Sequence, residues 1–302
     1  MKNMTENLEI MCITYSDRVV AFIDILGFKQ MIDDSEKDKS KIGYICNQLC
    51  YLKRMENNQN WNLNLIEIEE DAQKRDINKF DISQSVVCTC FSDTIVVSVT
   101  YTDDNINEVV STLIANISQI GAKLITEGIV VRGAISIGKL FHTDNGIING
   151  KALIDAYLLE QKAKYPRIIL SDKLISKLNY PICSKRERYP YHQYLNRFED
   201  GFVGFHQMTY YQVLQSWIKM DKKQLKKDLE KIRSAIISGL DSTFENPDIF
   251  EKYVWLKSQY NELIILSDNT KINIKELNQG IAGQNIHYKY TDDFYKNINK
   301  DN

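Results

Sequence analysis

Apolar and polar residues alternate along the first three fifths of the chain as short strand-like and longer helix-like segments. Residues 18–27 (RVVAFIDILG) are an apolar, β-branched run interrupted by one Asp, which predicts a buried strand. Residues 85–100 predict two strands joined by a tight turn at Phe91-Ser92-Asp93. The other predicted elements are helices over residues 35–54, 106–120 and 150–163, and strands over 128–142 and 167–171.

The order of these elements is β-α-ββ-α-β-α-β, which predicts an α+β, ferredoxin-like sheet with helices on one face. We assign them to a first domain, residues 1–182, with a polar, Asn-rich insertion at about 55–82. Residues 183–302 form a second part, with a hairpin around Glu199-Asp200-Gly201 and a mainly helical extension over residues 216–266. The last two dozen residues are polar and predict a loosely held tail.

Charge and composition exclude several classes of protein. The chain has 38 Lys and Arg against 40 Asp and Glu, so the global charge does not indicate nucleic-acid binding. There is no run of 18 apolar residues, and Glu6 and Glu9 interrupt the region where a signal peptide needs an apolar core, so we expect a cytoplasmic protein that does not span a membrane. Six cysteines without a CxxC pair predict buried, reduced thiols, and four scattered His argue against zinc.

Two aspartates are candidates for chemistry. Asp24 lies inside an apolar strand, where a carboxylate is costly unless it is paired, hydrogen-bonded or metal-bound; an Asp that caps the following turn gives the same pattern. Asp93 lies at a hairpin tip, where Asp is also common as a turn residue. In a ferredoxin-like sheet we expect the first strand to lie beside the strand that begins the hairpin, so the two carboxylates would meet and suit Mg²⁺ or Mn²⁺.

The turn after the first strand adds a third element. Ile25-Leu26-Gly27-Phe28 connects a strand to a helix through a glycine, so its backbone amides could hold a polyphosphate. Two acids, two cations and a phosphate-binding turn together indicate a palm-type phosphoryl-transfer site.

At these residues the chain resembles the class III nucleotidyl cyclases. FIDILGF (residues 22–28) is similar to that family's first metal motif, F-x-D-I-x-G-F, and FSDTIVVSV is similar to its second-aspartate hairpin, with Ser92 in place of the usual glycine. VRGAISIGKLF and GKALIDAYLLE resemble the strand and helix that follow. The resemblance covers roughly residues 18–172 and implies a palm-type cyclase catalytic domain over residues 1–182.

The departures from the family concern base selection and transition-state stabilisation. Thr89 and Ile147 stand where purine cyclases carry their base-selecting residues. Ile154 and Leu158 stand where the family has the Asn and Arg that stabilise the transition state.

The chain most resembles the pyrimidine cyclases of the bacterial Pycsar anti-phage defence system. That resemblance implies conversion of UTP, or less often CTP, to the 3′,5′-cyclic nucleotide and pyrophosphate. It also implies a separate effector that the cyclic nucleotide activates. The C-terminal KYVWLKSQYNELI is similar to the helical extension of the same branch.

The resemblance also assigns roles to residues of this chain. Two Mn²⁺ or Mg²⁺ ions would contact Asp24, Asp93 and the Ile25 carbonyl, and the amides of Leu26, Gly27 and Phe28 would hold the triphosphate. Phe22 and Thr89 would line the base pocket. Head-to-tail homodimers complete each site in this family, and the candidate completing residues here are Arg132, Asp155, Tyr157 and Lys151.

Each completing residue also has a simpler interpretation. Arg132 could form a structural salt bridge. Asp155 and Glu160 could belong to a solvated helix face, Lys151 could be a first-turn lysine, and Tyr157 could pack in the core. The Lys-rich stretch 221–231 also contains Asp221, Asp228 and Glu230, so it predicts a solvated helix and not a nucleic-acid surface.

Two alternative functions follow from the same residues. A catalytically inactive cyclase-like module that senses a nucleotide is favoured by the missing Asn and Arg and opposed by the two retained aspartates. Another palm-type enzyme, such as a diguanylate cyclase or a polymerase, would need a GGDEF run or further acids beside Asp93, and neither is present.

Overall fold

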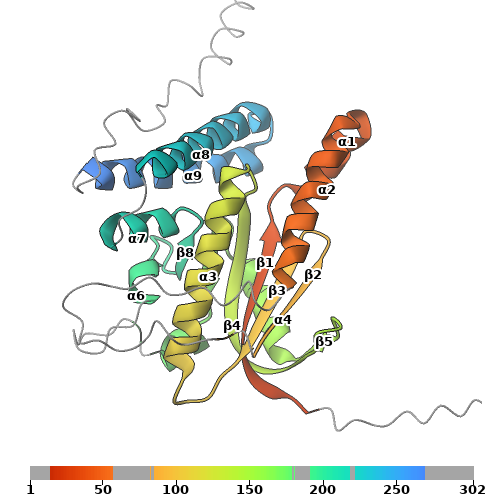
Figure 1. Cartoon of the computed structure of the whole chain (residues 1–302), viewed down its shortest axis with the longest axis vertical. Helices are drawn as coiled ribbons and strands as arrows, with labels where there is room; N and C mark the ends of the chain where they lie inside the picture. Colours follow the sequence, from red (N-terminus) through yellow and green to blue (C-terminus); the bar gives the residue numbers. More distant parts are fainter. Residues whose placement is uncertain are drawn as a thin grey trace, which may run out of the picture.

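The computed structural model describes residues 14–56, 82, 85–178, 180, 191–217 and 222–268 (Figure 1). Most of the predicted insertion and the whole polar tail lie outside these residues. The elements, in chain order, are β1 (Ser16–Ile25), α1 (Phe28–Lys37), α2 (Ser40–Lys53), the short 3₁₀ turn η1 (Arg54–Glu56), β2 (Val86–Phe91), β3 (Thr94–Thr100), α3 (Ile106–Thr126), β4 (Val131–His142), β5 (Ile148–Asn149), α4 (Lys151–Glu160), β6 (Arg167–Leu170), α5 (Asp172–Lys177), α6 (Tyr191–Tyr194), β7 (Asn196–Arg197), β8 (Val203–His206), α7 (Thr209–Trp217), α8 (Lys222–Thr243) and α9 (Pro247–Asp268).

The strands form one sheet in the order β2-β3-β1-β4-β6-β8-β7, with β5 paired to β4. Its first four strands are antiparallel and have the ferredoxin-like order, which confirms the α+β class predicted from the sequence. One detail of that prediction is wrong. The neighbour of β1 is β3, the second strand of the hairpin, and not β2, the strand that begins it. β2 is the edge strand of the sheet and pairs only with β3.

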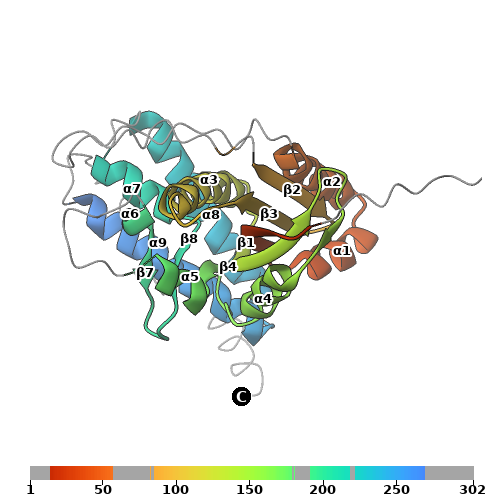
Figure 2. The same ribbon diagram turned by 90° about the horizontal axis from the view of Figure 1, so that it is seen from below.

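The sheet has helices on both faces, which corrects the expectation of one covered face (Figure 2). Alternate residues of β1 point to opposite faces. Val19, Ala21 and Ile23 belong to the main core with α3. Val20 and the half-buried Phe22 pack instead with Ala152 and Ala156 of α4 on the other face.

The first helical segment also differs from the prediction of one helix over residues 35–54. A helix begins already at Phe28 and ends at Lys37, and a second helix begins at Ser40. Asp38 separates them: its backbone is extended, and its carboxylate accepts hydrogen bonds from the backbone amide and the hydroxyl of Ser40. Such a local side-chain bond competes with continuation of the helix.

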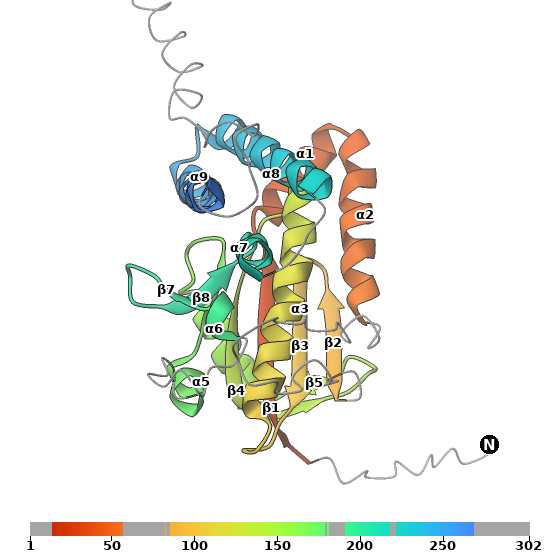
Figure 3. The ribbon, with the colours of Figure 1, turned by 60° about the vertical axis from the view of Figure 1, so that its left-hand side comes forward.

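The C-terminal part adds strands and helices to the same body. β8 pairs with β6, so the sheet is continuous across the predicted boundary at residue 182, and the hairpin predicted around residues 199–201 is β7–β8. The helical extension predicted over residues 216–266 is present as α8 and α9, whereas α7 begins earlier than predicted, at Thr209. α8 and α9 lie side by side across one end of α3 (Figures 1 and 3). Trp255 of α9 stacks on Tyr165 at 5.5 Å between ring centroids and so anchors this helix beside the sheet.

Helix α3 is long and apolar enough to cross a membrane by composition alone, and 72% of its most apolar window is buried between the sheet and neighbouring helices. It is therefore the core helix of this fold. Among the described cysteines, Cys88 is a buried thiol as predicted. Cys46 and Cys50 are exposed, because they lie on the outer side of α2.

Candidate active site

The end of β1 and the tip of the β2–β3 hairpin lie next to one another. The backbone amide of Ile25 donates to the carbonyl of Asp93 at 3.1 Å, and Asp24 is paired with Thr94. The expected meeting of Asp24 and Asp93 is therefore present in the structure. Ser92, which stands where the resemblance has glycine, adopts a left-handed φ of 53°, a conformation that glycine takes without strain.

Asp24 is held in an environment that disfavours its charge. Partial burial raises the pKa of Asp24 to about 6, and the nearby carboxylates of Asp93 and Glu160 add to the increase. Arg132, with Nη2 at 4.0 Å from Oδ2, and a 3.3 Å hydrogen bond from the Thr94 hydroxyl oppose it. Asp24 thus lies among more negative than positive groups, which is an arrangement that a bound cation would relieve.

The chemistry of these groups fits a hard divalent cation. Asp24 and Asp93 provide two carboxylates, and Mg²⁺ is commonly held by one or two carboxylates together with substrate phosphates. No cluster of three or more His, Cys, Asp or Glu that could hold a metal ion occurs among the described residues. The Ile25 carbonyl remains a predicted third ligand.

Arg132 lies between Asp24 and a second carboxylate, that of Glu160, whose burial the sequence did not predict. Its Nε donates to Oε1 of Glu160, and Gln161 donates to the other Glu160 oxygen at 2.6 Å. Glu160 is 1% exposed, so the interpretation of this residue as part of a solvated helix face is wrong. The salt bridge proposed for Arg132 is present, and a catalytic role for Arg132 stays a prediction.

The turn after β1 supports only part of the predicted phosphate cradle. The amide of Leu26 donates to the Val130 carbonyl at 2.8 Å, so this amide is already engaged and the prediction that it holds the triphosphate is not supported. Gly27 has a φ of 80° and precedes α1, which begins at Phe28. The amides at the start of a helix have no partner within it, so Gly27 and Phe28 remain the candidates for phosphate binding.

Phe22 and Thr89 lie in one row across the sheet. Phe22 of β1 is paired with Val96 of β3, and Val96 is paired with Thr89 of β2, so all three side chains point to the α4 face. Asp24 is two residues further along the same face of β1. The predicted base-pocket residues and the predicted metal ligand therefore share one surface.

Helix α4 presents both charged and apolar residues to solvent. Lys151 and Asp155 form an ion pair one turn apart, as expected of a solvated helix face. Tyr157 is 46% exposed and contacts Phe22 edge-on, so its expected place in the core is wrong. Ile154 and Leu158 are each 53% exposed, and with Tyr157 they form an apolar face on α4.

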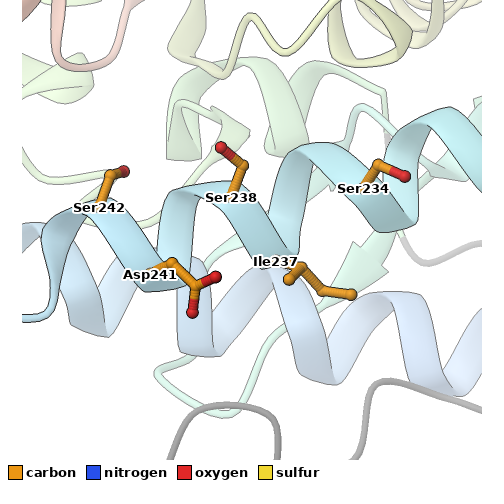
Figure 4. Close-up of a pocket in the computed structure, with 5 residues that line it drawn as sticks. All are labelled: Ser234, Ile237, Ser238, Asp241 and Ser242. Atoms are coloured by element: carbon orange, nitrogen blue, oxygen red, sulfur yellow. The ribbon is translucent and has the colours of Figure 1, made fainter. Parts of the chain in front are cut away.

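A hollow on the outside of α8 is unrelated to this site. It is lined by Ser234, Ile237, Ser238, Asp241 and Ser242, all from one helix (Figure 4). None of the predicted site residues lines it, and we place no chemistry there.

The sequence comparisons find no match: no protein-family model and no curated protein matches the chain. Among solved structures, the chain is similar to the adenylyl cyclase CyaB from P. aeruginosa, with a TM-score of 0.33, 16% identity, and coverage of 63% of this chain and 92% of that chain. It is also similar to the catalytic core of a rhodopsin-guanylyl cyclase with converted specificity in complex with ATPαS, with a TM-score of 0.37, 13% identity, and coverage of 64% and 96%. A monomeric guanylyl cyclase domain of the RhoGC fusion protein from the aquatic fungus Blastocladiella emersonii gives a TM-score of 0.38, 12% identity, and coverage of 63% and 95%.

Sequence reasoning missed one further group at this surface. His142, at the end of β4, is 7% exposed, and its ring nitrogens lie 2.9 Å from the Thr89 hydroxyl and 2.7 Å from the Ser98 hydroxyl. A single His at the end of an apolar strand was the only signal in the sequence, and nothing there indicated its partners.

Proposed function

We propose that this protein is a pyrimidine nucleotide cyclase that converts UTP, or less readily CTP, to the 3′,5′-cyclic monophosphate and pyrophosphate. The single observation that carries the proposal is the meeting of Asp24 and Asp93 beside the Gly27 turn. These residues belong to FIDILGF and FSDTIVVSV, the two segments that resemble the metal motifs of class III cyclases.

In the proposed reaction the ribose 3′-oxygen attacks the α-phosphorus in line, the bond from that phosphorus to the β-phosphate oxygen breaks, and pyrophosphate leaves. Two Mn²⁺ or Mg²⁺ ions, when bound, would lower the pKa of the 3′-hydroxyl and offset charge on the departing pyrophosphate. Asp24, Asp93 and the Ile25 carbonyl would hold them. The amides of Gly27 and Phe28 would orient the phosphates, and Phe22 and Thr89 would contact the base.

Arg132 contributes charge at the same end of the sheet. Its guanidinium lies between Asp24 and the buried Glu160. Because Glu160 holds the guanidinium in a fixed orientation, Arg132 can stabilise negative charge on the phosphates without first reorienting. We propose this role in place of the missing Asn and Arg of the family.

We further propose a homodimer with sites at the subunit interface. The apolar face of α4 carries the positions aligned with the missing Asn and Arg, namely Ile154 and Leu158, and it would be covered by a second subunit. Lys151 and Asp155, one turn apart on the same helix, would lie near that interface. A cytoplasmic location is the expectation from the composition of the chain. A separate effector activated by the cyclic nucleotide and a part in anti-phage defence follow from the resemblance alone.

A nucleotide-sensing module without catalysis is the second candidate. It is favoured by the apolar side chains at Ile154 and Leu158, which cannot stabilise transition-state charge. It is opposed by the pair Asp24 and Asp93, since binding a nucleotide does not require two carboxylates close to its phosphates.

The test is turnover by Asp24→Ala and Asp93→Ala. We expect each variant to lose at least about a thousandfold in activity, because cation binding and charge stabilisation are lost together. Asp17→Ala is the matched control, since Asp17 lies on the same strand and pairs with Lys139 at a distance from the site. Full activity in either site variant would refute the assignment, as would equal loss in the control.

A further inference from the structure

The helical extension lies at the end of the sheet that carries the candidate active site. Figure 3 shows α8 and α9 beyond the arrowhead of β1. Leu26, in the turn after β1, and Val130, just before β4, pack in one hydrophobic cluster with Phe250 and Tyr253 of α9. Because α9 lies outside residues 18–172, anything it adds to the site is additional to the segments that resemble a cyclase.

The first turns of α9 are fixed beside the end of α4. Glu251 accepts hydrogen bonds from Lys164 Nζ at 2.8 Å and from the Tyr165 hydroxyl at 2.9 Å. Trp255, one turn later on α9, stacks on the same Tyr165 ring. Lys164 and Tyr165 follow closely after α4, which ends at Glu160. These contacts set both the position and the rotation of α9 at this point.

Lys252, the next residue of α9, is half-buried near the guanidinium of Arg132. Burial lowers the pKa of Lys252 and the charge of Arg132 adds to the decrease, while three carboxylates oppose it, those of Asp248, Glu251 and Glu160. A partly buried ammonium beside a like charge is relieved by a bound anion, as the carboxylate of Asp24 would be relieved by a cation.

The neighbouring carboxylates do not neutralise Lys252 by direct contact. Glu251 and Glu160 already accept hydrogen bonds from other cations. Asp248, one turn earlier on α9, is exposed. Within the part of the chain that the structure describes, no carboxylate forms an ion pair with the Lys252 ammonium. A lysine on a solvated helix face would explain the charge but not the partial burial beside a guanidinium.

The place of Lys252 matches the phosphate end of the proposed site. The amides of Gly27 and Phe28 are the candidates for phosphate binding, and Leu26, directly before them, packs against the cluster that contains α9. Phe22, which would contact the base, lies on β1 on the other side of Asp24. A cation that α9 supplies therefore approaches the phosphates and not the base.

On the basis of the proposed cyclase function, we propose that Lys252 binds the terminal phosphates of the nucleoside triphosphate within the same chain. An ammonium on a flexible stem suits phosphate oxygens as a point charge. Arg132, held by Glu160, and Lys252 together place two positive charges at this end of the site. Lys252 is then a substrate-binding residue, and one function of the helical extension is to complete the phosphate site.

The first test is the steady-state kinetics of UTP conversion. We expect Lys252→Gln, which removes the charge from the helix, to raise KM for UTP about tenfold or more and to change kcat little, because the terminal phosphates are held in both the ground state and the transition state. Lys252→Arg should retain most of the affinity. Lys257→Gln is the matched control, since Lys257 lies five residues further along α9 and so on a different face.

The second test measures the phosphate site without turnover. Inorganic tripolyphosphate has no ribose or base, so its titration in the presence of Mg²⁺ reports phosphate binding alone. Its Kd should rise about tenfold in Lys252→Gln and stay unchanged in Lys257→Gln. The free energy of unfolding of ligand-free Lys252→Gln should not fall, because the repulsion with Arg132 is removed. Loss of stability together with binding would indicate a structural lysine and overturn the proposal.

The outcomes separate this proposal from the proposed function. If wild type makes a cyclic nucleotide and Lys252→Gln keeps the wild-type KM and tripolyphosphate affinity, the role of Lys252 is wrong and the cyclase remains. If wild type makes no cyclic nucleotide but Lys252→Gln alone weakens tripolyphosphate binding, the cyclase fails and the phosphate site stands. If wild type binds neither tripolyphosphate nor UTP, both are wrong.

Discussion

The ion pair between Arg132 and Glu160 should contribute measurably to the free energy of unfolding of the protein. Glu160 is 1% exposed and Arg132 19% exposed. Removing one partner of a buried ion pair leaves an unpaired charge and typically costs about 3–5 kcal/mol, whereas replacing both partners with apolar residues is often nearly neutral. Arg132 keeps some contact with water, so we expect Arg132→Met to lower the free energy of unfolding by about 2–3 kcal/mol.

The assay is a double-mutant cycle measured by urea denaturation at pH 7.5. Glu160→Leu should cost about 1–2 kcal/mol, because Arg132 retains Asp24 at 4.0 Å and its partial contact with solvent. The double variant should then lose about 2 kcal/mol less than the sum of the single variants. Additive single effects would refute the reasoning, because they would mean that Glu160 is not held by the guanidinium.

Two further predictions concern pH and assembly. His206 is 2% exposed, and burial lowers its pKa from 6.5 to about 4, so the unfolded chain binds a proton in that range and the folded protein does not. The control is His206→Phe, which keeps an aromatic ring beside Trp255. The difference in the free energy of unfolding between wild type and this variant should be constant above about pH 7, and wild type should lose roughly 3 kcal/mol relative to the variant as the pH drops from 6.5 to 4. Stability curves that stay parallel over this range would contradict the prediction. Ile154→Glu should convert the proposed dimer to a monomer, measured by analytical ultracentrifugation, and abolish turnover. The control Ile42→Glu, at an exposed isoleucine of α2, should do neither. A dimer that persists in Ile154→Glu would show that α4 is not part of the interface.

Much of the fold follows from local patterns in the sequence. The apolar runs of β1, β3 and β4 and the stripe of α3 are long and regular, and their order restricts the sheet to very few topologies. The meeting of Asp24 and Asp93 could be predicted from that order alone. The two residues meet even though β3, and not β2, is the neighbour of β1, because the tip of the hairpin belongs equally to β2 and β3.

The parts that could not be predicted depend on contacts between distant residues. Glu160 ends α4 and is followed by the polar residues Gln161 and Lys162, so the sequence favours a solvated position; only the approach of Arg132 from β4 makes its burial tolerable. The Leu26 amide donates to the Val130 carbonyl, more than a hundred residues away in the sequence, and nothing in the turn itself indicates this bond. A hydrogen-bond chain through His142 joins residues 18, 89, 98 and 142, and no spacing within one segment could indicate it.

The most direct test of the central claim is a four-nucleotide incubation. Purified protein is mixed separately with ATP, GTP, CTP and UTP in the presence of Mn²⁺, and the products are identified by mass spectrometry. We predict cyclic UMP and pyrophosphate from UTP, less product from CTP, and none from either purine. A cyclic purine nucleotide would contradict the pyrimidine assignment, and the absence of any cyclic product would contradict the cyclase itself.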